Sequence, residues 1–205
     1  MSNSKPQITL YRGWDTPTQY VWSPFVTKLE LRLRLGDISY QTAAGNARVA
    51  PTGKIPYVGI RDGEVLTKIG DSALIAEHFI EDGILGTLGD DLGPVKKAED
   101  VALRALVEDR LYFFNMRERW LDNPYIQRDH VLGSFSPLLR FLISSMIYRQ
   151  HTKTLYGQGV GRFSADEARQ FREEIWRTIN NLLEQRRREA AVKEVKECFW
   201  CLGGD

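Results

Sequence analysis

The stretch Gly-Lys-Ile-Pro-Tyr-Val at residues 53–58, followed fifteen residues after Pro56 by Asp71-Ser72, decides how this sequence folds. A proline cannot donate to a sheet ladder, so Pro56 belongs at a strand start, where its peptide bond can be held cis. That geometry leaves the Ile55 backbone available to an extended peptide. A serine at the start of a helix, together with the free N–H groups there, suits a carboxylate. The two motifs together predict a cradle for a small peptide ligand.

The composition is that of an ordinary globular protein and excludes some partners. The 205 residues are 42% hydrophobic and 27% charged, and 28 Lys and Arg against 27 Asp and Glu give a net charge of +1. No overall field therefore favours nucleic acid or an anionic membrane. The run Arg186-Arg187-Arg188 alternates with glutamates on a predicted helix, which is typical of a solvated face.

Compartment follows from what the sequence lacks. It has no apolar run near the roughly 20 residues that span a bilayer, and residues 1–6 lack the apolar segment of a secretory signal. Two cysteines, Cys198 and Cys201, are too few for a disulfide framework and fit a reducing compartment. We expect a cytoplasmic protein.

Residues 1–83 read as a thioredoxin-like α/β domain. β-formers predict a strand over 7–14, and apolar residues at helical spacing predict a helix that starts at Pro24 and ends at Gly36. Short strands are predicted at 38–42, 57–60 and 65–69, the last two joined by the hairpin signal Asp62-Gly63. A helix over 71–80 completes the order β-α-β-β-β-α.

Strand signals stop in the second half of the chain. Glycines and aspartates over 84–94 predict a linker, and residues 95–205 predict an all-helical domain. Long helices are expected from Val95, from Phe135 and from Ser164, where Ser164 and Glu167 form a capping box. Residues 157–161 are glycine-rich but lack the strand of a phosphate loop, so they predict a turn.

The whole chain resembles the soluble glutathione transferases, and more narrowly the branch that contains failed axon connections and the metaxins. The motifs that carry this resemblance are Ser-Pro-Phe-Val-Thr-Lys-Leu-Glu at 23–30, the run at 53–57, Asp71-Ser72, and Gly-Gln-Gly-Val-Gly-Arg-Phe-Ser at 157–164. Family members continue into a further buried helix after the position of residues 202–205. A truncated helical domain is therefore expected, with uncovered apolar surface on the helices that start at 95 and 164.

The resemblance implies that Ser23 touches the sulfur of glutathione. A thiol of pKa about 8.5 needs a depression of roughly one to two units, worth about 1.4 to 2.7 kcal/mol, to be largely ionised at pH 7. A hydroxyl donor contributes about 1.5 to 3 kcal/mol and a helix start about 0.3 to 1 kcal/mol. The implied reaction is attack of the thiolate on an electrophilic carbon, with no metal or redox cofactor.

Two alternatives to a catalytic Ser23 stay open. Ser before Pro is a common helix entry, so Ser23 can serve as a helix cap alone. Tyr11 is a rival sulfur donor, because other transferase classes use a tyrosine at the end of the first strand. A serine rather than a cysteine at residue 23 argues against disulfide exchange of the glutaredoxin kind.

The remaining predicted contacts to glutathione follow the family pattern. Ile55 and Pro56 offer backbone contacts, although the same proline is kept in related folds without a ligand. Asp71 and Ser72 match the acidic-Ser pair that grips the γ-glutamyl end, a role compatible with simple capping. Lys54 pairs with the glycyl carboxylate or is only solvated.

Other features that suggest redox chemistry, metal binding or a substrate pocket are also explained by structural roles. A working Cys-x-x-Cys opens the first helix of a thioredoxin fold, whereas Cys198 and Cys201 lie near the end of the chain. Two cysteines and three scattered histidines do not make a metal site. An aromatic cluster either lines an electrophile pocket or belongs to the core: Tyr112, Phe113, Phe114 and Trp120.

The sequence therefore predicts a glutathione transferase that conjugates glutathione to hydrophobic electrophiles, with a homodimer implied by kinship. The alternative is a noncatalytic scaffold of the failed axon connections or metaxin kind, which acts through protein contacts and can lie at the mitochondrial outer membrane surface. A third reading is a fragment without independent function.

Overall fold

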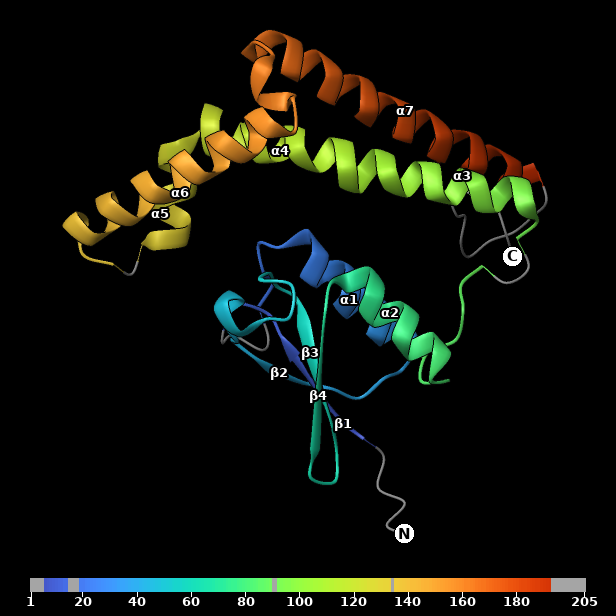
Figure 1. The fold of residues 1–205 in the computed structure, drawn as a ribbon. Coiled ribbons are helices and arrows are strands. Elements are labelled where there is room, and N and C mark those ends of the chain that lie inside the picture. The colour runs from blue at the N-terminus through green and yellow to red at the C-terminus, as the bar shows by residue number, and fades with distance from the viewer. Residues whose placement is uncertain (1–5, 15–18, 90–91, 134, 193–205) are drawn as a thin grey trace. The chain divides into compact units, whose positions relative to one another are not determined.

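The computed structural model describes residues 6–14, 19–89, 92–133 and 135–192. The chain forms two compact units, Met1–Asp90 and Asp91–Asp205, which are considered separately (Figure 1). The predicted class, a thioredoxin-like α/β domain followed by an all-helical domain, is confirmed. The finer boundaries, with a linker over 84–94, stay a prediction.

The first unit is built around a mixed sheet. Its elements are β1 (Gln7–Tyr11), α1 (Pro24–Leu35), β2 (Gln41–Ala43), η1 (Ala47–Val49), β3 (Tyr57–Asp62), β4 (Val65–Gly70) and α2 (Ser72–Glu81). Within the described ranges the strand order is β2-β1-β3-β4, with β1 parallel to β2 and the other neighbours antiparallel. The parallel pair requires α1 to run back along the sheet between β1 and β2.

One face of this sheet carries the core. Leu29 and Leu33 of α1 and Ile75 and Phe79 of α2 pack with Leu10 and its neighbours on the strands, and each of these five side chains is at most 1% exposed. Figure 1 shows both helices on the same side of the strands. The alternate buried residues of β1 and the apolar stripe of α1 therefore belong to one core layer.

Two predicted strand limits are wrong, for local reasons. The predicted strand 7–14 ends at Tyr11, because the chain turns at Gly13, whose φ is +90°. The predicted strand 38–42 is shifted to 41–43, because Ile38 closes the end of α1: its N–H donates to the Leu33 carbonyl (2.9 Å). This is a Schellman ending in which Asp37, at φ +52°, takes the left-handed position that glycine usually fills.

The second unit is all helical. Its elements are α3 (Pro94–Ala105), η2 (Leu106–Leu111), α4 (Tyr112–Arg117), η3 (Glu118–Asp122), α5 (Pro124–Leu132), α6 (Pro137–Gly157), η4 (Val160–Arg162) and α7 (Ala165–Val192). The first four form one continuous helical segment, in which η2 and η3 are π-helical. The sequence analysis missed α5, where Pro124 starts a helix instead of only breaking one.

The predicted capping box starts α7. Glu167 N–H donates to Ser164 Oγ (3.2 Å), and Ser164 N–H donates to Glu167 Oε2 (2.8 Å). The hydrogen bonds from the Ser164 backbone and side chain hold the pKa of Glu167 below its ordinary value. The core of the unit lies beside this start, where Phe114 packs with Phe163 and Phe171.

Apolar side chains are exposed on α3 and α7, and charged side chains pair with one another at the end of α7. Val95 and Val101 of α3 and Trp176 of α7 are exposed. At the end of α7, Arg186 pairs with Glu189 (2.8 Å) and Arg188 with Glu184 (3.4 Å). Two of the three arginines of the run thus pair with glutamates of their own helix, as expected for a solvated face.

Candidate functional site

Strand register brings the predicted ligand motifs to one end of the sheet. Tyr11 lies opposite Tyr57, and Tyr57 lies opposite Gly70. The last residue of β1, the first of β3 and the last of β4 therefore lie at the same end of the sheet. Pro56 and Asp71 are neighbours there. Because α1 runs back from the carboxyl end of β1, its first residues also lie at this end. This end of the sheet in the first unit, called the sheet end below, is the candidate site.

Residues 52–56, called the cis-proline strap below, pack onto the sheet end. The Ile55–Pro56 peptide bond is cis, as predicted, and Pro56 is buried. The Ile55 side chain lies directly against Gly13, where a Cβ atom would overlap it. A Cβ at Gly70 would come within 2.9 Å of Thr52 Oγ1 and 3.2 Å of Thr52 N. The strap, residues 52–56, is thus held between the loop after β1 and the start of α2.

The start of α2 is strained and partly buried. Asp71 has φ +75° and ψ 129°, and its carboxylate accepts from the Ala73 N–H at 2.9 Å. A residue other than glycine in such a conformation costs on the order of 1–3 kcal/mol and persists where its surroundings fix it. Ser72 follows as the first helical residue and is 4% exposed. The register of Tyr57 with Gly70 sets this helix start next to Pro56, with Ser72 almost fully buried.

Ser23 caps α1 at the sheet end. Its Oγ accepts from the Val26 N–H at 3.4 Å, and its carbonyl accepts from the Thr27 N–H at 3.2 Å. Accepting through oxygen leaves the hydroxyl hydrogen able to donate. Ser23 is half-buried.

Tyr11 lies on the opposite face of the sheet from α1. The neighbouring Leu10 is in the core under α1 and α2, and side chains alternate faces along a strand. The Tyr11 ring stacks on Tyr57 with centroids 4.3 Å apart and an interplanar angle of 12°. The choice between Ser23 and Tyr11 as the sulfur donor stays a prediction. Lys54 is exposed in the strap.

Sequence reasoning missed a buried ion pair behind this site. Arg12 follows β1 directly and is 1% exposed, and its Nε lies 3.0 Å from Oε1 of Glu30 in α1. The available signal was the place of Glu30, one residue after Leu29 and three before Leu33, on the apolar stripe of the helix. A charge on such a stripe requires a partner.

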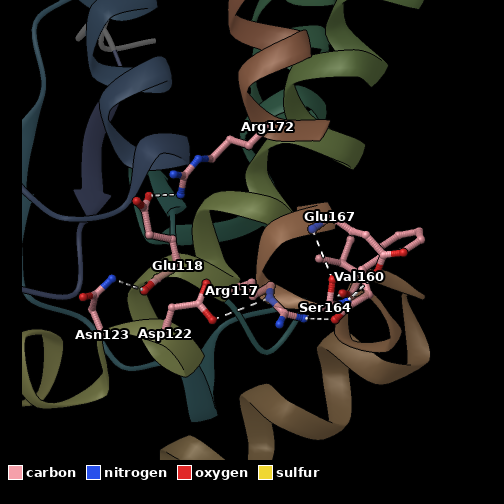
Figure 2. Close-up of polar contacts among 9 residues, drawn as sticks. Arg117, Glu118, Asp122, Asn123, Val160, Ser164, Glu167 and Arg172 are labelled. Atoms are coloured by element: carbon pink, nitrogen blue, oxygen red, sulfur yellow. Dashed lines mark hydrogen bonds and ion pairs between the residues drawn. The ribbon is translucent and has the colours of Figure 1, made fainter. Parts of the chain in front are cut away.

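The helical unit contains a small cavity of its own. It measures about 200 Å³ and is lined by Phe114, Glu118, Asp122, Asn123, Ala165, Ala168, Arg169 and Arg172. Figure 2 shows the Arg172 guanidinium on the Glu118 carboxylate and the Asn123 side chain on the Glu118 carbonyl, the latter at 3.0 Å. The walls carry two acidic and two basic side chains, of which Glu118 and Arg172 pair with each other.

Arg117, also missed from the sequence, clamps the glycine-rich run beside this cavity. It is 8% exposed and donates to the carbonyls of Val160 at 3.1 Å and Phe163 at 2.9 Å (Figure 2). Its Nε lies 3.6 Å from the Asp122 carboxylate. The predicted turn at 157–161 is therefore anchored to α4, with Gly159 at φ +90°.

The aromatic cluster is mainly core. Phe114 is 2% exposed, while Tyr112, Phe113 and Trp120 pack partly buried against the same core. Burial raises the pKa of Tyr112, partly offset by Arg119. His151 stacks on Trp120 with centroids 4.6 Å apart, and burial lowers the pKa of His151.

Two further sequence predictions concern metal and membrane. Among the residues that the structure describes, no group of three or more His, Cys, Asp or Glu side chains is arranged to hold a metal ion. Cys198 and Cys201 lie outside the described residues. No helix in the described part of the chain is both long and apolar enough to cross a bilayer.

Comparison with known proteins gives consistent matches. Residues 24–125 match the family model of the glutathione S-transferase N-terminal domain. The protein Failed axon connections of Drosophila melanogaster is 27% identical over 199 residues, which cover 88% of this chain. The chain spans only 45% of the length of that relative.

The solved structures that resemble this chain include two of glutathione transferase Omega 2S from Trametes versicolor. The complex with 2,4-dihydroxybenzophenone is 20% identical and covers 83% of each chain, with a TM-score of 0.40. The other is 23% identical and covers 80% of this chain and 68% of the fungal one, with a TM-score of 0.32. With the family-model match and the thioredoxin-like sheet before a helical unit, the chain belongs to the glutathione transferase superfamily.

Proposed function

We propose that this protein binds glutathione at the sheet end and conjugates it to hydrophobic electrophiles. The observation that carries the proposal is that three elements lie at the sheet end: the cap of α1 at Ser23, the cis-proline strap, and the strained start of α2. Each supplies a group that one part of a tripeptide requires. The membership of the chain in the superfamily supports glutathione as that tripeptide.

The proposed binding mode assigns one contact to each part of glutathione. Ile55 precedes the β3 ladder, which begins at Tyr57, so its backbone suits the cysteinyl main chain as an added strand. Ser72 and the first N–H groups of α2 suit the γ-glutamyl carboxylate, since a helix start favours an anion. Lys54, exposed in the strap, suits the glycyl carboxylate. No metal is required.

In the proposed reaction Ser23 stabilises the thiolate. Its hydroxyl donates to the sulfur anion, and the start of α1 adds a favourable field. Together they supply the roughly 1.4 to 2.7 kcal/mol that ionisation at neutral pH requires. The sulfur lone pair forms a bond to the electrophilic carbon, and the leaving group departs with the electron pair of the broken bond. A cytoplasmic homodimer is part of this proposal.

A noncatalytic scaffold is the second candidate, favoured by the similarity to Failed axon connections over most of this chain. Such a protein would work through protein contacts, in the cytoplasm or at the mitochondrial outer membrane surface, and would not need glutathione. Calorimetric titration of the protein with reduced glutathione at neutral pH separates the two candidates. We expect saturable binding with a stoichiometry of one per chain; heats equal to those of dilution would favour the scaffold.

Replacing Ser23 by Ala is expected to slow conjugation of a model aromatic electrophile at least tenfold at pH 7, while glutathione still binds. The reason is the lost thiolate donor, worth about 1.5 to 3 kcal/mol. Steady-state rates with saturating glutathione measure the effect. Because Ala also removes the cap of α1, Ser23→Asp serves as a second variant: aspartate caps a helix but donates no proton when ionised.

We expect the Ser23→Asp protein to be as slow as Ser23→Ala although its helix is capped. Ser39→Ala, an exposed serine after α1, is the matched control and should keep the parent rate. A Ser23→Asp variant that conjugates at the parent rate would show that residue 23 is only a cap.

A further inference from the structure

The buried pair of Arg12 and Glu30 joins three segments around the sheet end. Arg12 Nη2 donates to the Gln19 carbonyl at 2.6 Å and to Glu30 Oε2 at 3.3 Å, while its Nε lies 3.0 Å from Glu30 Oε1. The Arg12 N–H donates to the Ala43 carbonyl at 2.9 Å. One side chain thus ties the end of β1 to the body of α1 and to the loop that leads to Ser23.

This pair fixes where α1 begins. Glu30 lies seven residues after Ser23, about two helical turns along α1. Gln19 lies four residues before Ser23, on the incoming loop. Holding the helix body and the loop to the same guanidinium leaves the segment between them little freedom. Gly13, the next residue after Arg12, is packed on Ile55, so the same loop also touches the strap.

We propose that Arg12 and Glu30 form a positioning pair that sets the Ser23 hydroxyl against the cis-proline strap, an inference that rests on the proposed function for its catalytic consequence. Removing two charges from water is expensive, and a buried ion pair often stabilises a fold no better than two apolar residues of similar size. The pair at the sheet end therefore serves geometry: a guanidinium held by a carboxylate and a carbonyl fixes direction, which apolar side chains do not.

The test separates an effect on the position of Ser23 from an effect on the stability of the first unit. Arg12→Met and Glu30→Leu, each alone, leave one buried charge without its partner, and we expect both to lower the urea midpoint of the first unit. The double variant Arg12→Met, Glu30→Leu removes both charges, and we expect a urea midpoint near that of the parent protein. Of these three variants, only the double variant is informative about positioning, because it is the one expected to keep the stability of the parent.

In the double variant we expect two changes, the second of which a purely structural pair would not cause. Hydrogen exchange of the amides at residues 19–27, which include the N–H groups bonded to Ser23, should accelerate at least tenfold. The pH profile of conjugation should shift upward toward the pKa of free glutathione, with the rate at pH 7 at least tenfold lower. Arg12→Lys, which keeps the charge but not the fork, should show the same two changes in weaker form.

The control is the pair of Glu118 and Arg172 in the helical unit. Glu118→Leu, Arg172→Met should leave exchange at 19–27 and the pH profile unchanged. Parent-like exchange and rate in the Arg12→Met, Glu30→Leu protein would overturn the proposal. If the parent protein does not bind glutathione, the proposed function fails, and the exchange measurement alone decides the positioning role: accelerated exchange supports it, and unchanged exchange overturns it.

Discussion

Replacing Arg117 by Met is expected to lower the free energy of unfolding of the helical unit by about 3 to 5 kcal/mol. Arg117 is almost fully buried and donates to two carbonyls of the run before α7, those of Val160 and Phe163. Each hydrogen bond from a charged donor contributes about 1.5 to 3 kcal/mol, and methionine leaves both acceptors without this donor. Urea unfolding followed by far-ultraviolet circular dichroism, to which the helices contribute most, measures the change.

The matched control is Arg119→Met, two residues along the same segment, where the side chain is exposed. It should stay within about 0.5 kcal/mol of the parent protein. An Arg117→Met protein with an unchanged midpoint would mean that the glycine-rich run is anchored by other contacts. In that case the motif at 157–164 would owe its form to its glycines alone.

Replacing Ile75 by Ala is expected to lower the free energy of unfolding of the first unit by about 2 to 5 kcal/mol. Its side chain is 0% exposed in the layer between α2 and the sheet, with Leu10 and Phe79. The lost methylene groups leave a cavity that close-packed neighbours fill only in part. Ile75 N–H also donates to the Asp71 carbonyl at 2.9 Å, so the cavity would form at the first turn of α2. Chemical denaturation measures the loss.

Leu74 provides the control for that substitution. It is the preceding residue on α2, has the same number of carbons, and is 53% exposed. Leu74→Ala should lower stability by less than about 1 kcal/mol. Equal losses at residues 74 and 75 would contradict the packing described for α2, because the helix would then bury its other side.

Much of the candidate site follows from local signals in the sequence. The cis bond at Pro56, the cap at Ser23 and the helix start at Asp71-Ser72 each depend on a few adjacent residues, and the βαβ order then brings them to one edge. The positive φ of Asp71 is not predictable in this way, because an aspartate rarely adopts it.

What the sequence analysis missed depends on contacts between distant residues. Arg12 and Glu30 are 18 residues apart, and Arg117 and Val160 are 43 apart, so no periodic pattern connects them. The long helix expected from Val95 is present, but the π-helical turns η2 and η3 within this segment were missed, since such turns break the 3.6-residue spacing that identifies a helix. The helix α5, which starts at Pro124, was missed as well.

The contact between Gly13 and Ile55 limits how the chemistry of this fold can diversify. Residue 13 has a left-handed backbone, and a Cβ there would overlap the Ile55 side chain, so a reactive side chain at this position would be strained and would displace Ile55. Residue 23, ten residues further along the chain, caps α1, and there a change of one atom, oxygen to sulfur, would turn a hydroxyl donor into a thiol.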